Sequence, residues 1–171
     1  MVDDSRDAKV LIDPMRRAIL ELLREKPMTQ TQLANELGLT APSLSYHMKV
    51  LKSKRFVTIF NKKVGSHGIV QIFFTTSAYV FIYDLKALPR GIARYFFPVA
   101  LERTRAMVSA LLLLKKGYTV EKDSSTITDL SVKLSDLIVS AASSYTSKNV
   151  TFGKESIIFE IYTKALKNLI K

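Results

Sequence analysis

The stretch TQTQLANELGLTAPSLSYHMKVLKSKR, residues 29–55, contains two short helix patterns separated by a tight turn. Thr29 and Gln32 have the spacing of a capping box, which starts a helix, and Gly38 is suited to end it because glycine tolerates a left-handed backbone. Thr40 and Pro42 repeat the starting signal. The stretch therefore predicts a helix, a tight turn and a second helix that runs over residues 41–54.

This second helix has one apolar and one polar face. The apolar positions recur at helical spacing and are expected to be buried; they are Leu44, His47, Met48 and Leu51. The polar face carries hydroxyls, an aromatic ring and a cation, from Pro42, Ser45, Tyr46 and Lys49, with Ser43 at its edge. Such groups can contact base edges and phosphates in a DNA major groove. A purely structural helix more often carries Glu–Lys pairs here, and this face has none.

The segments on either side extend the pattern. Asp13–Pro14 starts an earlier helix, and its helical pattern of apolar residues stops at Lys26–Pro27. Residues 1–12 are expected to form an N-terminal arm. Downstream, residues 56–60 and 69–74 are β-branched and aromatic, which predicts a hairpin with a basic tip over residues 61–68. A hairpin behind a helix-turn-helix is a wing. We expect the cations of its tip, above all Lys62 and Lys63, to reach the DNA backbone or the minor groove.

Residues 13–76 resemble the winged helix-turn-helix of ArsR-type transcriptional regulators. The resemblance is carried by LANELGLT (residues 33–40), by LSYHMKVLK (residues 44–52) and by the hairpin that follows. It implies a dimeric DNA-binding regulator in which residues 42–49 read the operator. Two departures stand out: the chain has no cysteine, so the cysteine-based metal sensing of some members does not carry over, and Lys54–Arg55 replaces the usual Ala-Gly ahead of the wing.

The charge distribution points to a polyanionic partner. The chain has 26 Lys and Arg against 15 Asp and Glu, a net charge of +11, and no acidic residue lies between Glu36 and Asp84. The alternative is an ordinary solvated lysine face. The candidate DNA-binding residues are Thr40, Pro42, Ser43, Ser45, Tyr46, Lys49, Lys52, Arg55, Lys62, Lys63 and His67.

Residues 77–171 are predicted to be all-helical. Pro89 and Pro98 interrupt an aromatic segment, after which helices are expected over residues 99–116, around residues 127–141 and over residues 158–169, with a polar loop at residues 143–153. Residues 106–114 are apolar nearly all round, so a helix there needs cover on every face. We expect this region to serve dimerisation or effector binding; the alternative is an ordinary intramolecular bundle.

Several kinds of chemistry are not expected. Without cysteine there are no disulfides and no thiolate sites, and His47 is interpreted as a core residue with a satisfied nitrogen and no acidic partner. No phosphate loop or nucleophile elbow is present, so we expect no catalytic residue, no metal and no cofactor. Residues 1–9 lack the pattern of a signal peptide, and residues 106–114 are too few to cross a bilayer, which favours a cytoplasmic protein.

Together these observations predict a mostly α fold with a small β-hairpin: a winged helix-turn-helix domain followed by an all-helical region. The expected function is sequence-specific, dimeric regulation of transcription on double-stranded DNA, without enzymatic activity. Two alternatives remain open at this point: a non-specific architectural DNA-binding protein, and a winged-helix module that binds another protein.

Overall fold

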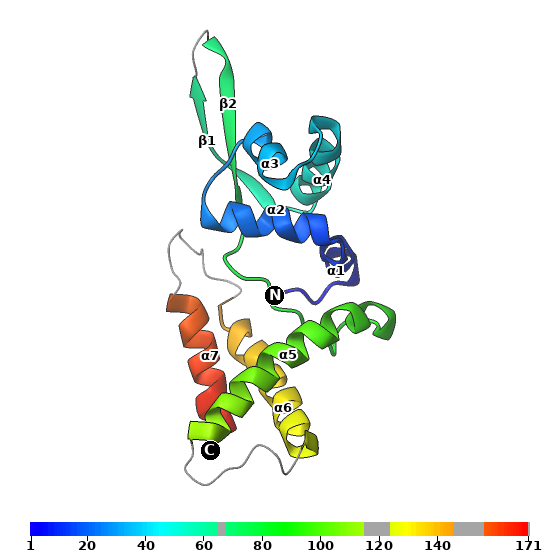
Figure 1. Ribbon diagram of the computed structural model, residues 1–171, viewed down its shortest axis with the longest axis vertical. Helices are drawn as coiled ribbons and strands as arrows, with labels where there is room; N and C mark the ends of the chain where they lie inside the picture. Colours follow the sequence, from blue (N-terminus) through cyan, green and yellow to red (C-terminus); the bar gives the residue numbers. More distant parts are fainter. Residues whose placement is uncertain (65–67, 115–123, 146–155, 171) are drawn as a thin grey trace. The chain divides into compact units, whose positions relative to one another are not determined.

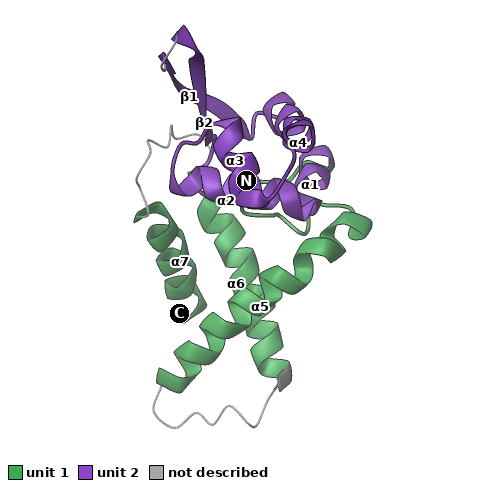
Figure 2. Ribbon diagram, turned by 45° about the horizontal axis from the view of Figure 1, so that its top comes forward, with its two compact units in different colours: residues 1–5, 80–171 green, residues 6–79 purple. Residues whose placement is uncertain are grey.

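The computed structural model describes residues 1–64, 68–114, 124–145 and 156–170 (Figure 1). The chain divides into two compact units, Arg6–Tyr79 and Met1–Ser5 with Val80–Lys171, which are coloured separately in Figure 2. The described residues are mostly helical, with one two-stranded antiparallel hairpin. The predicted fold class is confirmed.

The unit of residues 6–79 contains the predicted helix-turn-helix. Its elements are α2 (Pro14–Glu25), α3 (Gln30–Leu37), α4 (Ala41–Ser53), β1 (Val57–Val64) and β2 (Val70–Thr76). The helix starts occur where the sequence places them: Asp13 and Thr40 accept bonds from the amides of Arg16 (3.1 Å) and Ser43 (3.4 Å). Thr29 and Gln32 form both bonds of a capping box, at 3.2 and 2.9 Å.

Apolar side chains from all these elements form one core. Its fully buried members include Ile19, Leu23, Leu33, Leu44, Met48 and Leu51. The base of the hairpin is tied to the turn between α2 and α3, because Met28 and Phe74 exchange two backbone hydrogen bonds, of 3.0 and 2.8 Å. The predicted buried stripe of α4 is confirmed at Leu44, Met48 and Leu51, so this helix is fixed along its whole inner face.

Residues 1–12, expected to be an arm, contain a further helix, α1 (Ser5–Ile12). The last carbonyls of a helix have no partner within it, and α2 supplies partners here: Arg16 donates to the carbonyl of Val10, and Arg17 to those of Leu11 (2.7 Å) and Ile12 (2.8 Å). Two arginines that follow α1 thus stabilise its C-terminus.

The hairpin has longer strands than predicted. Residues 61–64 belong to β1 and pair with β2, so the expected tip is wrong in extent, and Lys62 and Lys63 lie within a strand. The register shifts between Ile59 and Asn61, which marks a bulge at Phe60. Residues 65–67, including His67, lie outside the described residues.

The other unit contains the three predicted helices, α5 (Arg90–Leu114), α6 (Ser124–Ser143) and α7 (Ser156–Leu169). Figure 1 shows α5 crossing α6, and α6 packs against both of its neighbours. The core includes Val108, Leu112, Ile127, Leu134, Ile161 and Ala165. The hydroxyl of Tyr145 donates to the Glu160 carboxylate (2.9 Å), and this bond raises the pKa of Tyr145.

Two expectations about α5 need correction. It begins at Arg90 rather than at residue 99, and it continues through Pro98. The ring of Phe96 stacks on that of Tyr83 at 4.0 Å, which fixes the earlier part of the helix in the core.

The apolar stretch at residues 106–114 is covered on one side only, since Leu113 and Leu114 are 62% and 83% exposed. The expected end at Gly117 and most of the loop at residues 143–153 lie outside the described residues.

Candidate nucleic-acid interface

The outer face of α4 is the most complete candidate surface. Pro42, Ser45, Tyr46 and Lys49 are all exposed and lie at helical spacing on one side, with Tyr46 62% exposed. Ser43 is half-buried, and its amide is held by the Thr40 hydroxyl. The predicted polar face is therefore brought together as a single stripe, and Thr40 with Ser43 shapes its N-terminal edge.

Lys52 continues this stripe toward the hairpin. Its ammonium group lies 5.4 Å from the centre of the Phe74 ring, within the range of a cation–π contact. Phe74 is buried at the base of β2. The contact therefore places the cationic end of α4 beside the base of the hairpin.

Arg55 lies directly after α4 in an unusual backbone conformation, with φ of 58°. The amide of Arg55 donates to the carbonyl of Lys52 (3.0 Å), and that of Phe56 to Leu51 (2.9 Å), which is the pattern of a Schellman motif. At the end of α3 the same motif has glycine, Gly38, at φ of 62°. Arg55 thus adopts a left-handed backbone that favours glycine, and its side chain is exposed.

Lys62 and Lys63 point to opposite faces of the hairpin. Lys62 pairs with Ile72, whereas Lys63 pairs with Gln71 and places its ammonium 5.3 Å from the Phe73 ring. Residues two apart on a strand share a face, so Ile72 lies on the same face as Phe74, which Lys52 contacts. The face with Lys62 is therefore the one continuous with Lys52.

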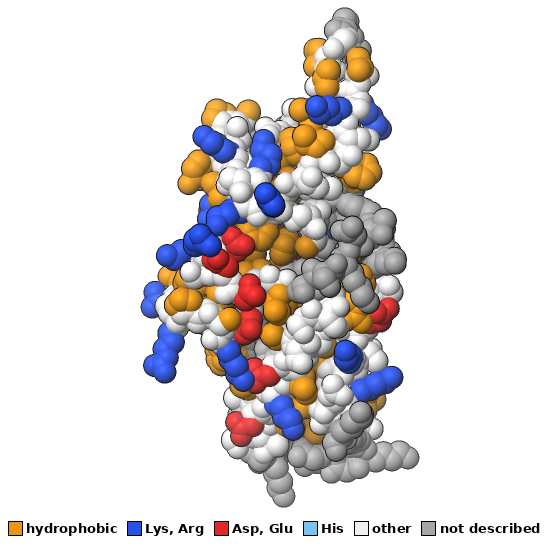
Figure 3. Space-filling view, turned by 180° about the vertical axis from the view of Figure 1, so that it is seen from behind, with side chains coloured by type: hydrophobic (Ala, Val, Ile, Leu, Met, Phe, Trp, Pro, Cys, Tyr) orange, Lys and Arg blue, Asp and Glu red, His pale blue; other side chains and the backbone are white. Residues whose placement is uncertain are grey.

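The same face carries exposed aliphatic side chains that the sequence analysis did not single out. Ile59, Val64 and Val70 are 49%, 75% and 55% exposed, and cross-strand pairing places all three with Lys62. In Figure 3 the hairpin projects at the top and carries basic and hydrophobic side chains but no acidic ones. The sequence does not reveal this surface, because the alternation of side chains along the two strands does not show which face of the hairpin is covered by the rest of the protein.

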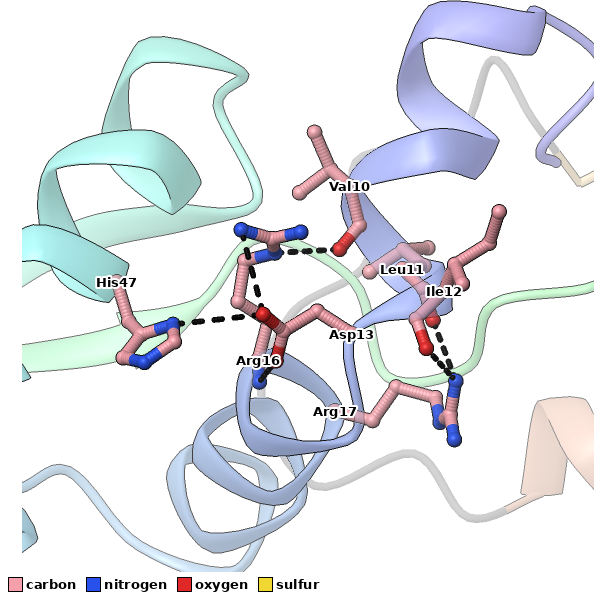
Figure 4. Close-up of polar contacts among 7 residues, drawn as sticks. All are labelled: Val10, Leu11, Ile12, Asp13, Arg16, Arg17 and His47. Atoms are coloured by element: carbon pink, nitrogen blue, oxygen red, sulfur yellow. Dashed lines mark hydrogen bonds and ion pairs between the residues drawn. The ribbon is translucent and has the colours of Figure 1, made fainter.

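His47 differs from its interpretation as a satisfied core residue. Its side chain is 15% exposed, and its Nδ1 atom is shielded from solvent without a hydrogen bond among the described residues. The nearest acidic oxygen is Oδ2 of Asp13, at 3.8 Å (Figure 4). The expected absence of an acidic partner is therefore wrong: His47 faces the carboxylate that caps α2.

One ion pair lies near the C-terminal end of α4. Lys54 pairs with Asp7 of α1 at 3.1 Å, which neutralises one cation near the end of α4.

In the described part of the chain no cluster of His, Asp and Glu is suited to a metal ion. None of the described helices combines the length and apolarity needed to cross a bilayer.

Residues 11–59 match the family model described as a helix-turn-helix domain. The match runs from the end of α1 into β1, and the paired strand β2 completes the wing. Residues 6–79 form a winged helix-turn-helix.

Two curated proteins resemble the same part of the chain. The HTH-type transcriptional regulator Rv2034 of Mycobacterium tuberculosis (strain ATCC 25618 / H37Rv) is 36% identical over 64 residues, 37% of this chain and 58% of that protein. The transcriptional repressor SdpR of Bacillus subtilis (strain 168) is 35% identical over 54 residues, 32% of this chain and 60% of that protein. The chain thus spans about three fifths of the length of these relatives.

Among solved structures, that of PadR of Bacillus subtilis in complex with operator DNA matches over most of the chain. It covers 93% of both chains at 17% identity, with a TM-score of 0.36.

Proposed function

We propose that the protein is a sequence-specific DNA-binding regulator of transcription that inserts α4 into the major groove. The observation that carries this proposal is the outer face of α4, which is polar, exposed and free of acidic residues, on a helix anchored on its inner face by the buried Leu44, Met48 and Leu51. Such a helix is held rigidly by the protein while its other side is free to contact bases. The names of the two curated relatives support a regulatory role.

The candidate residues differ in the contacts with DNA that their chemistry allows. Ser45 and Tyr46 are proposed to contact bases, and Pro42 to contact a thymine methyl group. Lys49 reaches either guanine or phosphate. The remaining candidates, except Lys63, which points to the opposite face of the hairpin, are assigned to the DNA backbone, which fixes orientation without reading sequence; they are Thr40, Ser43, Lys52, Arg55, Lys62 and His67.

We further propose that the regulator acts as a homodimer through its C-terminal helices, is of the ArsR type, is cytoplasmic and has no enzymatic activity. Two-fold symmetry matches the palindromic half-sites that helix-turn-helix dimers bind. The exposed apolar side of α5 supports a partner subunit, because the described residues leave that side uncovered.

Selection of bound duplexes from a random library, with the purified protein, tests the proposal. We expect enrichment of one palindromic sequence that binds at least ~10³-fold more tightly than unrelated DNA at physiological salt. Competition with unrelated DNA is essential, because a steep salt dependence accompanies specific and non-specific binding alike. Equal affinity for all duplexes would indicate an architectural protein, and no affinity for any duplex would indicate a protein-binding module.

A further inference from the structure

We propose that His47 is a positioning residue for DNA recognition: its ring, held by the Asp13 carboxylate, fixes the exposed ring of Tyr46 in the orientation that contacts a base. This inference rests on the proposed function and deepens it, because it names a half-buried residue that shapes the sequence preference of α4. In this role His47 acts through Tyr46 and does not itself touch DNA.

The start of α2 holds the Asp13 carboxylate in place. Its Oδ1 atom accepts the hydrogen bond from the Arg16 amide (3.1 Å) that caps the helix, and its Oδ2 atom lies 3.6 Å from Nη1 of the Arg16 side chain. Arg16 is itself anchored, because its Nε atom donates to the carbonyl of Val10 in α1. The carboxylate therefore has little freedom to move, and Figure 4 shows it facing His47 of α4.

The imidazole of His47 meets this carboxylate with one of its nitrogens. Nδ1 lies 3.8 Å from Oδ2 of Asp13, is shielded from solvent and has no hydrogen-bond partner among the described residues. A carboxylate repels a nitrogen lone pair but attracts an N–H group. Nδ1 of His47 therefore carries a hydrogen, and Asp13 holds the ring from this side.

The ring of His47 in turn contacts the ring of Tyr46. The two ring centres are 5.5 Å apart and the ring planes meet at 73°, which is the edge-to-face arrangement that aromatic pairs favour. Tyr46 is 62% exposed on the outer face of α4. An exposed side chain loses rotamer freedom when it binds, and a contact that fixes it beforehand reduces that loss. The contacts thus connect the start of α2 to a side chain proposed to read DNA.

A second acidic residue beside α4 provides a matched control. Asp7 of α1 pairs with Lys54, at the end of α4, over 3.1 Å. Asp7→Asn and Asp13→Asn change the charge of the protein equally, and each removes a carboxylate that lies near α4. Of the two residues, Asp13 is the one that faces His47. Asparagine caps a helix as well as aspartate does, so Asp13→Asn retains the start of α2.

The first measurement uses the full-length protein without DNA. Three-bond scalar couplings of Tyr46, measured by NMR, report how its χ1 rotamers are populated. We expect one dominant rotamer in the unmodified protein and in Asp7→Asn, and a mixture of rotamers in Asp13→Asn. The same rotamer populations in all three proteins would overturn the proposal.

The second measurement uses the selected duplex and versions of it that are altered at one base pair each. Tyr46→Ala identifies the base pair at which Tyr46 contributes to the preference. At that base pair Asp13→Asn is expected to reduce discrimination about 2- to 10-fold, and elsewhere in the half-site to leave it unchanged. Asp7→Asn should change the affinity for all duplexes alike and preserve every preference, because it acts on a cation and not on Tyr46.

Two further variants test the route through the rings. His47→Phe keeps a ring beside Tyr46 but cannot donate to Asp13, so it should match Asp13→Asn in discrimination. Asp13→Asn added to Tyr46→Ala should cost no further discrimination, because its effect passes through Tyr46. Full discrimination by His47→Phe, or an undiminished effect of Asp13→Asn in the Tyr46→Ala protein, would overturn the proposal.

The outcomes separate this inference from the proposed function. If the unmodified protein selects a sequence and Asp13→Asn keeps full discrimination, this inference fails and the proposed function stands. If the unmodified protein selects no sequence, both fail. Thermal melts of every variant, with binding measured below the lowest melting temperature, exclude loss of folding as the cause of any difference.

Discussion

At the scale of single residues, Arg55 has opposite expected effects on stability and on DNA binding. A non-glycine residue in a left-handed backbone destabilises the folded state by about 1–2 kcal/mol. Replacing it with glycine removes this cost, but the larger conformational entropy of glycine in the unfolded state offsets part of the gain. We therefore expect Arg55→Gly to raise the free energy of unfolding by about 0.5–1 kcal/mol. The loss of an exposed cation is expected to weaken DNA binding and to reduce the slope of log affinity against log salt by about 1.

Denaturant unfolding and anisotropy titrations at several salt concentrations measure both effects. Gly38 provides the matched control, since it ends α3 in the same motif and a Cβ atom added there would meet nothing within 4 Å. Gly38→Ala should lower stability by about 1 kcal/mol through its backbone alone. If Arg55→Gly raises stability but leaves DNA affinity unchanged, Arg55 does not contact DNA. If Arg55→Gly lowers stability, the argument from the left-handed backbone is contradicted.

Lys62 and Lys63 are adjacent in sequence but are expected to differ in DNA binding. Because the face with Lys62 is continuous with Lys52 of α4, Lys62→Ala should reduce the salt slope by about 1. Lys63→Ala should leave the slope nearly unchanged, which makes each variant the control for the other. Equal losses, or a larger loss for Lys63→Ala, would show that the hairpin meets DNA with its other face or its edge.

At the scale of elements, the two faces of α4 are expected to respond separately. Met48 is fully buried, so Met48→Ala should lower the free energy of unfolding by about 2–5 kcal/mol by creating a cavity. Tyr46→Ala should leave stability within about 0.5 kcal/mol but cost about 1–3 kcal/mol of affinity at the bases that Tyr46 contacts. Thermal melts and binding to the selected duplex distinguish the two; a Tyr46→Ala protein with unchanged sequence preference would contradict the proposed role of Tyr46.

Elements with local signals were predicted well. The starts of α2, α3 and α4 depend on Asp13, Thr29 and Thr40, each of which caps a helix within a few residues of itself. The buried stripe and the exposed face of α4 follow from helical periodicity. The exposed candidates on α4 could therefore be identified from the sequence.

Elements that depend on distant contacts were not predicted. The carbonyls at the end of α1 are bonded by Arg16 and Arg17 of the next helix, and no pattern within residues 5–12 reveals this. Pro98 is a breaker by its own chemistry, but the stack of Phe96 on Tyr83 holds the preceding turns in place. The contact between His47 and Asp13 likewise depends on how α4 packs beside the start of α2.

At the scale of the whole molecule, two copies bound to one duplex imply strong coupling between half-sites. We expect the full-length protein to bind a palindromic site at least ~100-fold more tightly than a duplex with one intact half-site, because the second contact is then intramolecular. Anisotropy titrations of the two duplexes at one salt concentration give this ratio. Equal affinities would contradict dimeric recognition, and a duplex with both half-sites scrambled controls for backbone binding.

The proposed entry of α4 into the major groove is tested most directly by methylation interference on the selected duplex. Methyl groups on guanine N7 obstruct the major groove, whereas those on adenine N3 obstruct the minor groove. We predict that methylated guanines within each half-site block binding of the unmodified protein, in a pattern related by two-fold symmetry. Full binding to duplexes methylated at every guanine N7 of the half-sites would contradict this account.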